Sequence, residues 1–176
     1  MSIIIIGLNM YVQPNNMAGS ARVWVYSPDR FLTDNEAASI GKELIDFVHQ
    51  WTAHDKNLKS TVAIRFNRHI TLAVDEGVAQ ASGCSIDTSV KFIQELGAKY
   101  NFDGLDRLKY TYIEDGKPKL ISHHDLIKAI EEQRVDKNTR VVNPLVKTWE
   151  DYNSNFIIPL KESFLMRFVD LSKTEL

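Results

Sequence analysis

Cys84, the only cysteine of the chain, is the residue with the clearest potential for chemistry. It lies in the segment Ser82–Asp87, where the sequence predicts the start of a helix. A thiol at a helix N-terminus faces unpaired backbone N–H groups and the positive end of the helix dipole, and both favour the nucleophilic thiolate. His69 as base, with Asp87 or Asp75 to orient it, would complete a catalytic triad. This interpretation predicts a Cys84-dependent hydrolase or transferase.

The competing interpretation of this segment is structural. A free cysteine is often a small buried residue, and here Cys84 would pack at the start of a helix that Ser82 or Ser85 caps. Triads are assembled in space, so the positions of Cys84 and His69 in the sequence are permissive evidence only. The sequence therefore favours the structural interpretation.

The sequence gives weaker evidence for other reactive sites, and we predict no metal site and no cofactor. Asp46 and His49 are three residues apart on an expected helix, but a dinuclear carboxylate centre needs several such pairs. The adjacent His123 and His124 diverge on a helix. The chain has neither zinc-finger nor HExxH spacing.

Nucleotide binding through a P-loop is excluded, because the sequence lacks the P-loop motif. That loop needs GxxxxGK followed by Ser or Thr, because its backbone amides, lysine and hydroxyl hold phosphate and magnesium. Gly41-Lys42 is followed by Glu43 and lies in the middle of an expected helix.

The composition is that of a globular protein. Among 176 residues, 44% are hydrophobic and 25% are charged, which argues against disorder of the whole chain. The formal net charge of −2 gives no global field for nucleic acid. The apolar block Ile3–Ile6 is too short for a membrane span or a secretory signal, and one cysteine fits a reducing compartment. We therefore expect a soluble, cytoplasmic protein.

The first half of the chain predicts strands and two helices. Arg22–Tyr26 has strand character, and the capping-box pattern from Thr33 to Glu36 predicts a helix that reaches Trp51. Residues 61–74 alternate as one long strand or as a hairpin turning at residues 67–69, and the pattern does not decide between them. The second helix follows Ser82, with a predicted buried stripe of Ile86, Val90, Ile93, Leu96 and Tyr100.

The second half predicts a hairpin of residues 107–113 and 117–121 with a three-residue loop. That register would place Leu108, Tyr110, Tyr112, Pro118 and Leu120 on one face. It would place Arg107, Lys109, Lys117 and Lys119 on the other face, where the absence of aromatic residues makes nucleic-acid binding unfavoured. A helix after Ser122, a strand at Val141-Val142 and a short helix after Thr148 follow. A last amphipathic helix would carry Leu160, Phe164, Phe168 and Leu171.

This order of elements predicts an α+β protein with a mixed, largely antiparallel sheet and about four to five helices. We expect a peripheral extension at residues 1–20, whose first 16 residues can be deleted. An α/β unit would cover residues 21–103, and a hairpin-helix-strand unit with terminal helices would cover residues 104–176. One continuous domain is the alternative.

Two resemblances add to this prediction. Residues 22–169 resemble a small family of bacterial proteins that often carry an "ABC transporter ATPase" label, which the missing P-loop contradicts. The segments that carry this resemblance are Arg22-Val23-Trp24, Arg30-Phe31-Leu32-Thr33, Gln50-Trp51-Thr52-Ala53-His54, Ala81–Asp87, Asn143-Pro144-Leu145-Val146 and Pro159-Leu160-Lys161-Glu162-Ser163.

Residues 110–149 resemble a GYF-like domain, a class that binds proline-rich peptides on an aromatic surface. The matching positions are Asp115-Gly116, Ser122, Leu126, Ile130, Val135, Thr139, Val141 and Trp149. A groove lined by Tyr110, Tyr112 and Trp149 would support this binding. We therefore expect a non-enzymatic interaction or accessory module with a protein or peptide partner, and a Cys84-dependent enzyme is the alternative.

Overall fold

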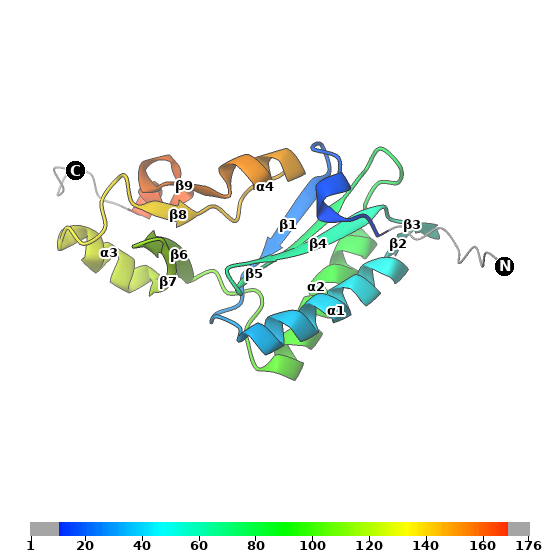
Figure 1. Cartoon of the computed structure of the whole chain (residues 1–176), viewed down its shortest axis with the longest axis horizontal. Helices are drawn as coiled ribbons and strands as arrows, with labels where there is room; N and C mark the ends of the chain where they lie inside the picture. Colours follow the sequence, from blue (N-terminus) through cyan, green and yellow to red (C-terminus); the bar gives the residue numbers. More distant parts are fainter. Residues whose placement is uncertain (1–10, 169–176) are drawn as a thin grey trace.

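The computed structural model describes residues 11–168 and confirms the α+β prediction. This part of the chain forms four α-helices and three antiparallel sheets. In Figure 1 the first half of the chain forms a three-stranded sheet that α1 and α2 cover, and β6–β9 with α3 form the other end of the molecule. The helix α4 comes from the second half of the chain but lies over the first sheet.

The first sheet has the strand order β1-β5-β4, with β5 (His69–Val74) between β1 (Arg22–Tyr26) and β4 (Ser60–Arg65). Every residue of β5 is buried, because both faces of the sheet are covered. Successive side chains point to opposite faces of a strand. Ile70, Leu72 and Val74 face the core under α1 and α2, whereas Ala73 packs with the residues of α4. A two-stranded hairpin, β2 (Thr52–Ala53) with β3 (Lys56–Asn57), follows α1.

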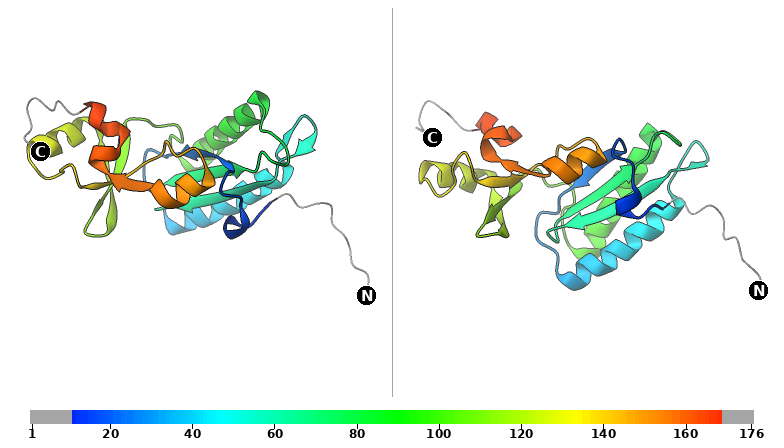
Figure 2. Two further views of the ribbon diagram at one scale, coloured as in Figure 1. Left: turned by 90° about the horizontal axis from the view of Figure 1, so that it is seen from above. Right: turned by 45° about the horizontal axis from the view of Figure 1, so that its top comes forward.

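The helices α1 (Asp34–Gln50) and α2 (Gly83–Tyr100) lie side by side on one face of this sheet (Figure 2). Both begin with a capping box, Thr33 with Glu36 and Ser82 with Ser85, so their predicted starts are confirmed. Contacts pair the end of α1 with the start of α2, and the two helices are therefore antiparallel. Their shared core consists mainly of Ile40, Leu44, Val48, Trp51, Ile70, Leu72, Val74, Ile93 and Leu96.

The buried face of α2 is rotated from the predicted stripe. Ser85 and Ser89 are buried, whereas Ile86 and Val90 are only half-buried. The Trp51 indole Nε1 donates to the carbonyl of Ser85 at 2.8 Å, and the hydroxyls of Ser89 and Tyr26 lie 2.8 Å apart. These long-range hydrogen bonds, which hydrophobic periodicity does not report, place the two serines inside.

Residues 60–74 form the hairpin that the sequence left open, with Ile64 opposite Ile70. Its turn begins one residue earlier than predicted. Phe66 and Asn67 both have positive φ, at 57° and 48°, a conformation that costs a bulky residue roughly 1–2 kcal/mol. Arg68 is the last residue of this three-residue loop, and its buried side chain reaches Pro28, Lys109 and Thr111.

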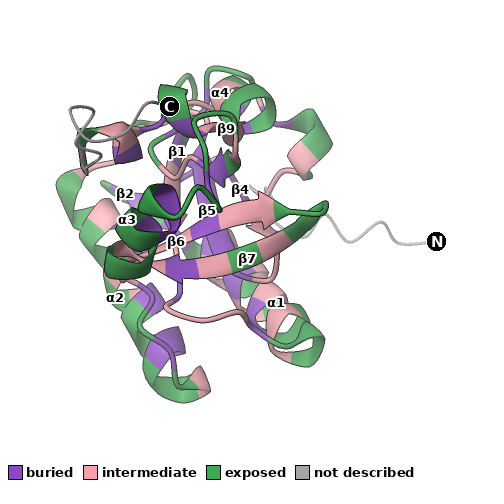
Figure 3. Ribbon diagram, turned by 90° about the vertical axis from the view of Figure 1, so that its left-hand side faces the viewer, coloured by how far each residue is buried: buried purple, intermediate pink, exposed green. Residues whose placement is uncertain are grey.

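The second sheet has the order β7-β6-β8-β9. Its strands are β6 (Lys109–Glu114), β7 (Lys117–Ser122), β8 (Arg140–Val142) and β9 (Ile157–Pro159), and α3 (His123–Glu131) follows β7. In Figure 3 the hairpin β6-β7 lies in front, below α3. The helix start at Ser122 and the strand at Val141-Val142 are confirmed.

The hairpin loop has two residues, not three, because Glu114 pairs with Lys117. Asp115 and Gly116 have φ of 49° and 74°, as a type I′ turn requires. A shift of one residue turns every side chain of a strand to its other face. Lys119 therefore lies opposite Tyr112, and the predicted division into a basic and an apolar face is wrong.

The short helix α4 (Trp149–Asn155) begins after Thr148 as predicted. It packs on the first sheet through a cluster that includes Val23, Ala73 and Phe156. The amphipathic helix predicted after Pro159 is wrong: two 3₁₀ segments, η2 (Leu160–Glu162) and η3 (Phe164–Phe168), take its place. Leu171 lies outside the described residues.

The described part of the predicted N-terminal extension has contacts with the first sheet. The amide of Val12 donates to the carbonyl of Ser60 at 2.8 Å, and η1 (Pro14–Asn16) follows. Met17 is buried in the cluster under α4. Residues 1–10 lie outside the described part. The prediction that residues 1–16 can be deleted did not take into account that residues 11–16 contact the first sheet.

Candidate functional site

The predicted catalytic residues are not brought together. Cys84 is exposed in the first turn of α2, which covers the face of β5 that carries Ile70 and Leu72. His69 lies on the opposite face of β5, where its ring meets Phe156 edge-on with the ring centroids 5.5 Å apart. The sheet therefore separates the thiol from the imidazole.

Both ring nitrogens of His69 are already occupied. Nδ1 lies 2.8 Å from the hydroxyl of Ser27, and Nε2 lies 3.0 Å from the hydroxyl of Thr111. Burial, with smaller effects of Arg68 and Arg65, lowers the pKa of His69 to about 3. The imidazole is therefore neutral near pH 7 and has a structural role in this arrangement.

The predicted acidic partners also lie apart from His69. Asp87 is an exposed residue of α2, one turn beyond Cys84. Asp75 accepts a hydrogen bond from Lys59 Nζ at 2.8 Å, and this contact, opposed by partial burial, lowers the pKa of the carboxyl group. Neither acid orients the imidazole in the described part of the chain.

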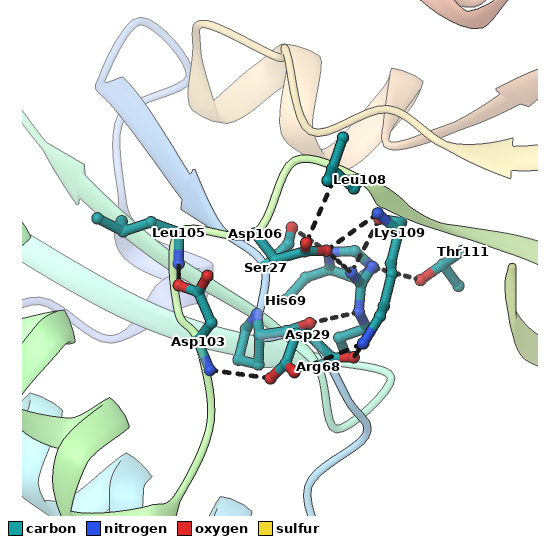
Figure 4. A network of polar contacts seen from close by, with 11 residues as sticks. Ser27, Asp29, Arg68, His69, Asp103, Leu105, Asp106, Leu108, Lys109 and Thr111 are labelled. Carbon is teal, nitrogen blue, oxygen red and sulfur yellow. Dashed lines mark hydrogen bonds and ion pairs between the residues drawn. The ribbon is translucent and has the colours of Figure 1, made fainter. Parts of the chain in front are cut away.

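The buried polar network around Arg68 joins the two halves of the chain (Figure 4). Its guanidinium is 1% exposed and donates to the carbonyls of Pro28 and Lys109 and to the hydroxyl of Thr111, at 2.7, 3.0 and 2.9 Å. Asp106 Oδ2 lies 3.7 Å from Arg68 Nη2. Burial lowers the pKa of Arg68 to about 10, against the opposing effect of Asp106, so the group is charged at neutral pH.

The hydroxyl of Thr111 links this arginine to His69. It accepts from Arg68 Nη1, and its own hydrogen can then be donated to His69 Nε2. This arrangement favours the tautomer with the proton on Nδ1, which donates to Ser27. Its polar groups are satisfied within the protein, so the network is a structural junction.

The three predicted binding aromatics do not line one groove. Tyr110 and Tyr112 pack against the core of the second sheet, with Leu126 and Leu160. Trp149 is buried under α4 in the other cluster, where it stacks on Tyr152 with ring centroids 4.9 Å apart.

Trp149 also lines a cleft of about 670 Å³ between η1 and α4. Trp149 is the one aromatic residue of this lining, which also contains Asn15, Glu150, Asn153 and Ser154. Clefts that bind ligands are usually lined by apolar and aromatic side chains with a few polar groups, so this cleft is the weaker candidate.

A cleft of about 480 Å³ lies between α1 and α2, and we call it the α1–α2 cleft. The helices position its aromatic residues Phe47, Trp51 and Phe92. The rings of Phe47 and Phe92 stack with centroids 4.4 Å apart, and Trp51 lies 5.4 Å from Phe47. The complete lining is Glu43, Asp46, Phe47, Gln50, Trp51, Thr52, Thr88 and Phe92.

The polar groups of the α1–α2 cleft differ between its two ends. At one end, Lys99 Nζ donates to both carboxylate oxygens of Glu43 at 2.9 Å, and the hydroxyl of Tyr100 also donates to that group. Near the other end, the hydroxyl of Thr88 donates to the carbonyl of Cys84 one turn earlier. The exposed Cys84 is thus one helical turn before a residue of the lining.

Sequence reasoning missed this cleft because it assigned Phe92 no role. The residue follows Lys91 and precedes the buried Ile93, so it lies off the predicted stripe of α2. A large aromatic residue off the apolar stripe was the available signal. Its meeting with Phe47 depends on the antiparallel packing of two helices that are distant in sequence.

No metal cluster and no membrane-spanning helix occur in residues 11–168. No three of their histidine, cysteine and acidic side chains are grouped to hold an ion. No helix among them has the length and apolar character to cross a bilayer.

Comparison of the chain with protein-family models, curated proteins and solved structures gave no match. The two resemblances drawn from the sequence therefore stay predictions. The geometry of the α1–α2 cleft is the feature of the molecule that bears on function.

Proposed function

We propose that the protein is a non-enzymatic interaction module and that the α1–α2 cleft binds a segment of a partner protein. The observation that carries this proposal is the aromatic pair of Phe47 and Phe92, which is half-buried in the free chain. Aromatic side chains provide much of the binding energy in protein interfaces, because they bury a large area at a small cost in conformational entropy.

The surroundings of the cleft support binding more than catalysis. Its lining has carboxylate, amide and hydroxyl groups but no histidine, lysine or cysteine. A Cys84-dependent hydrolase needs a base, and the imidazole proposed for this role lies on the other face of the sheet. A cytoplasmic location is part of the proposal and is supported by the exposed, unpaired thiol of Cys84.

The proposal can be tested with a displayed library of short peptides selected on the immobilised full-length protein. A fluorophore on Cys84, the only thiol, then reports the binding of each resynthesised peptide near the cleft. We expect Phe92→Ala to weaken binding at least about ten-fold, which is the usual effect for an aromatic residue at the centre of an interface. Circular dichroism establishes that the variant is folded.

Leu145→Ala is the matched control, because Leu145 is a 55% exposed apolar residue outside the cleft. It should bind the selected peptides as the wild type does. Failure to select any peptide, or equal binding by the Phe92→Ala variant, would contradict the proposed function.

A further inference from the structure

Charge is unevenly distributed in the α1–α2 cleft. Two carboxylates, Glu43 and Asp46, belong to its lining, and no lysine or arginine does. The rings of Phe47 and Phe92 lie between α1 and α2 beside these acids. The lining therefore combines two carboxylates, which attract cations, with aromatic rings that offer apolar contacts.

Glu43 is already paired within the protein. Its carboxylate accepts from Tyr100 and from Lys99, and these two contacts lower its pKa against the effect of partial burial. The ion pair with Lys99 compensates its charge and fixes its position at one end of the cleft. This carboxylate therefore has less capacity left for a ligand than an unpaired one.

Asp46 differs from Glu43 in having no internal partner. The residue is exposed, and within residues 11–168 its carboxylate forms neither a hydrogen bond nor an ion pair. Lys42, one turn earlier on α1, is also exposed and forms no ion pair with it. Asp46 and Phe47 both belong to the lining, so an uncompensated carboxylate shares the cleft with the aromatic rings.

We propose that the α1–α2 cleft selects a segment that presents an arginine or lysine, whose cation pairs with Asp46 beside Phe47 and Phe92. This inference rests on the proposed function, because it names the chemistry of the segment that the cleft binds. Apolar contacts with the rings provide affinity, and the carboxylate provides selectivity for a basic side chain. The methylene groups of such a side chain can pack on a ring while its charged end reaches the acid.

A double-mutant cycle tests this pairing in the full-length protein. The probes are peptides selected from the displayed library, resynthesised with arginine replaced by citrulline and lysine by acetyl-lysine, which keep the shape and remove the charge. Each pair of peptides is titrated against the wild type and Asp46→Asn at low salt. Asp87→Asn is the matched control, because Asp87 is an exposed carboxylate of α2 outside the lining.

Removal of either charge should weaken binding about two- to five-fold, within the range for an exposed ion pair. In Asp46→Asn, the charged and neutral peptides should bind almost equally, whereas Asp87→Asn should keep the wild-type preference. Added salt should reduce that preference in the wild type.

Three results would overturn the inference. If the selected peptides bind and need Phe92 but lose no affinity on charge removal, the cleft binds without selecting a cation, and only the inference fails. If no peptide is selected, the proposed function fails with it. If deletion of residues 1–10 alone increases affinity, the N-terminal segment of the chain competes for the cleft and is the occupant in place of a basic partner.

Discussion

The buried imidazole of His69 should make the protein less stable as the pH falls below neutral. Its pKa is about 3 in the folded protein and 6.5 in the unfolded chain. Between these values the unfolded state binds more protons, so stability is complete above the unfolded pKa and is lost as the pH falls towards 3. A pH of about 5 lies about 1.5 units below the unfolded pKa. The free energy of unfolding should therefore be lower there by about 2 kcal/mol.

The test compares the wild type with His69→Gln by urea denaturation between about pH 7 and pH 5. Glutamine keeps hydrogen-bonding capacity at this position but does not titrate. The wild type should lose about 2 kcal/mol more than the variant, or about 4–8 °C in melting temperature. Carboxylates with lowered pKa, such as Glu36 with a pKa of about 2, contribute to pH dependence only nearer pH 4 and below.

Parallel stability profiles of the two proteins would refute this reasoning. If the variant does not fold, the imidazole can be titrated directly in the wild type by NMR. A ring that becomes protonated near pH 6 while the protein remains folded would contradict the burial and the neutral hydrogen bonds described for His69.

Three further predictions concern the junction, the hairpin and the N-terminal segment. Arg68→Met should lower the free energy of unfolding, measured by urea denaturation, by about 3 kcal/mol or more, because it leaves buried acceptors and Asp106 without their cation. A loss below about 1 kcal/mol would contradict the structural role of the junction. Gly116→Ala should cost about 1 kcal/mol through backbone strain alone, since its added Cβ meets no atom within 4 Å, and an unchanged midpoint would argue against the two-residue turn. Deletion of residues 1–16 should lower the melting temperature more than deletion of residues 1–10, because only the longer deletion removes the hydrogen bond of Val12 to the first sheet. Equal effects of the two deletions would show that residues 11–16 add no stability.

The features that sequence predicted well are local. The helix starts at Thr33, Ser82, Ser122 and Thr148 depend on hydrogen bonds between residues three apart, and each is present. The strand at Arg22–Tyr26 also follows from alternation within a few residues. These patterns contain the partners that they need within a single turn or strand.

The features that sequence missed depend on distant partners. The buried serines of α2 follow from contacts with Tyr26 and Trp51, and the loop of the second hairpin differs from the prediction by one residue, which reverses a face. The helix α4 packs on a sheet formed much earlier in the chain. Local periodicity does not show which surface an element will cover.

The candidate site was predicted least well. Exposure of Cys84 and burial of His69 on opposite faces could not be read from their spacing, and neither could the separation of Trp149 from the two tyrosines. The α1–α2 cleft needs two aromatic residues from different helices to meet. The sequence predicted both helices but not how they pack on each other.

The central claim is that the α1–α2 cleft binds a protein segment. The most direct measurement is amide chemical-shift mapping on the isotope-labelled full-length protein, titrated with a peptide selected on the wild type. The account predicts that the largest shifts lie in residues 46–52 and 88–92. Largest shifts in the hairpin β6-β7 or around the cleft between η1 and α4, with none between α1 and α2, would contradict it.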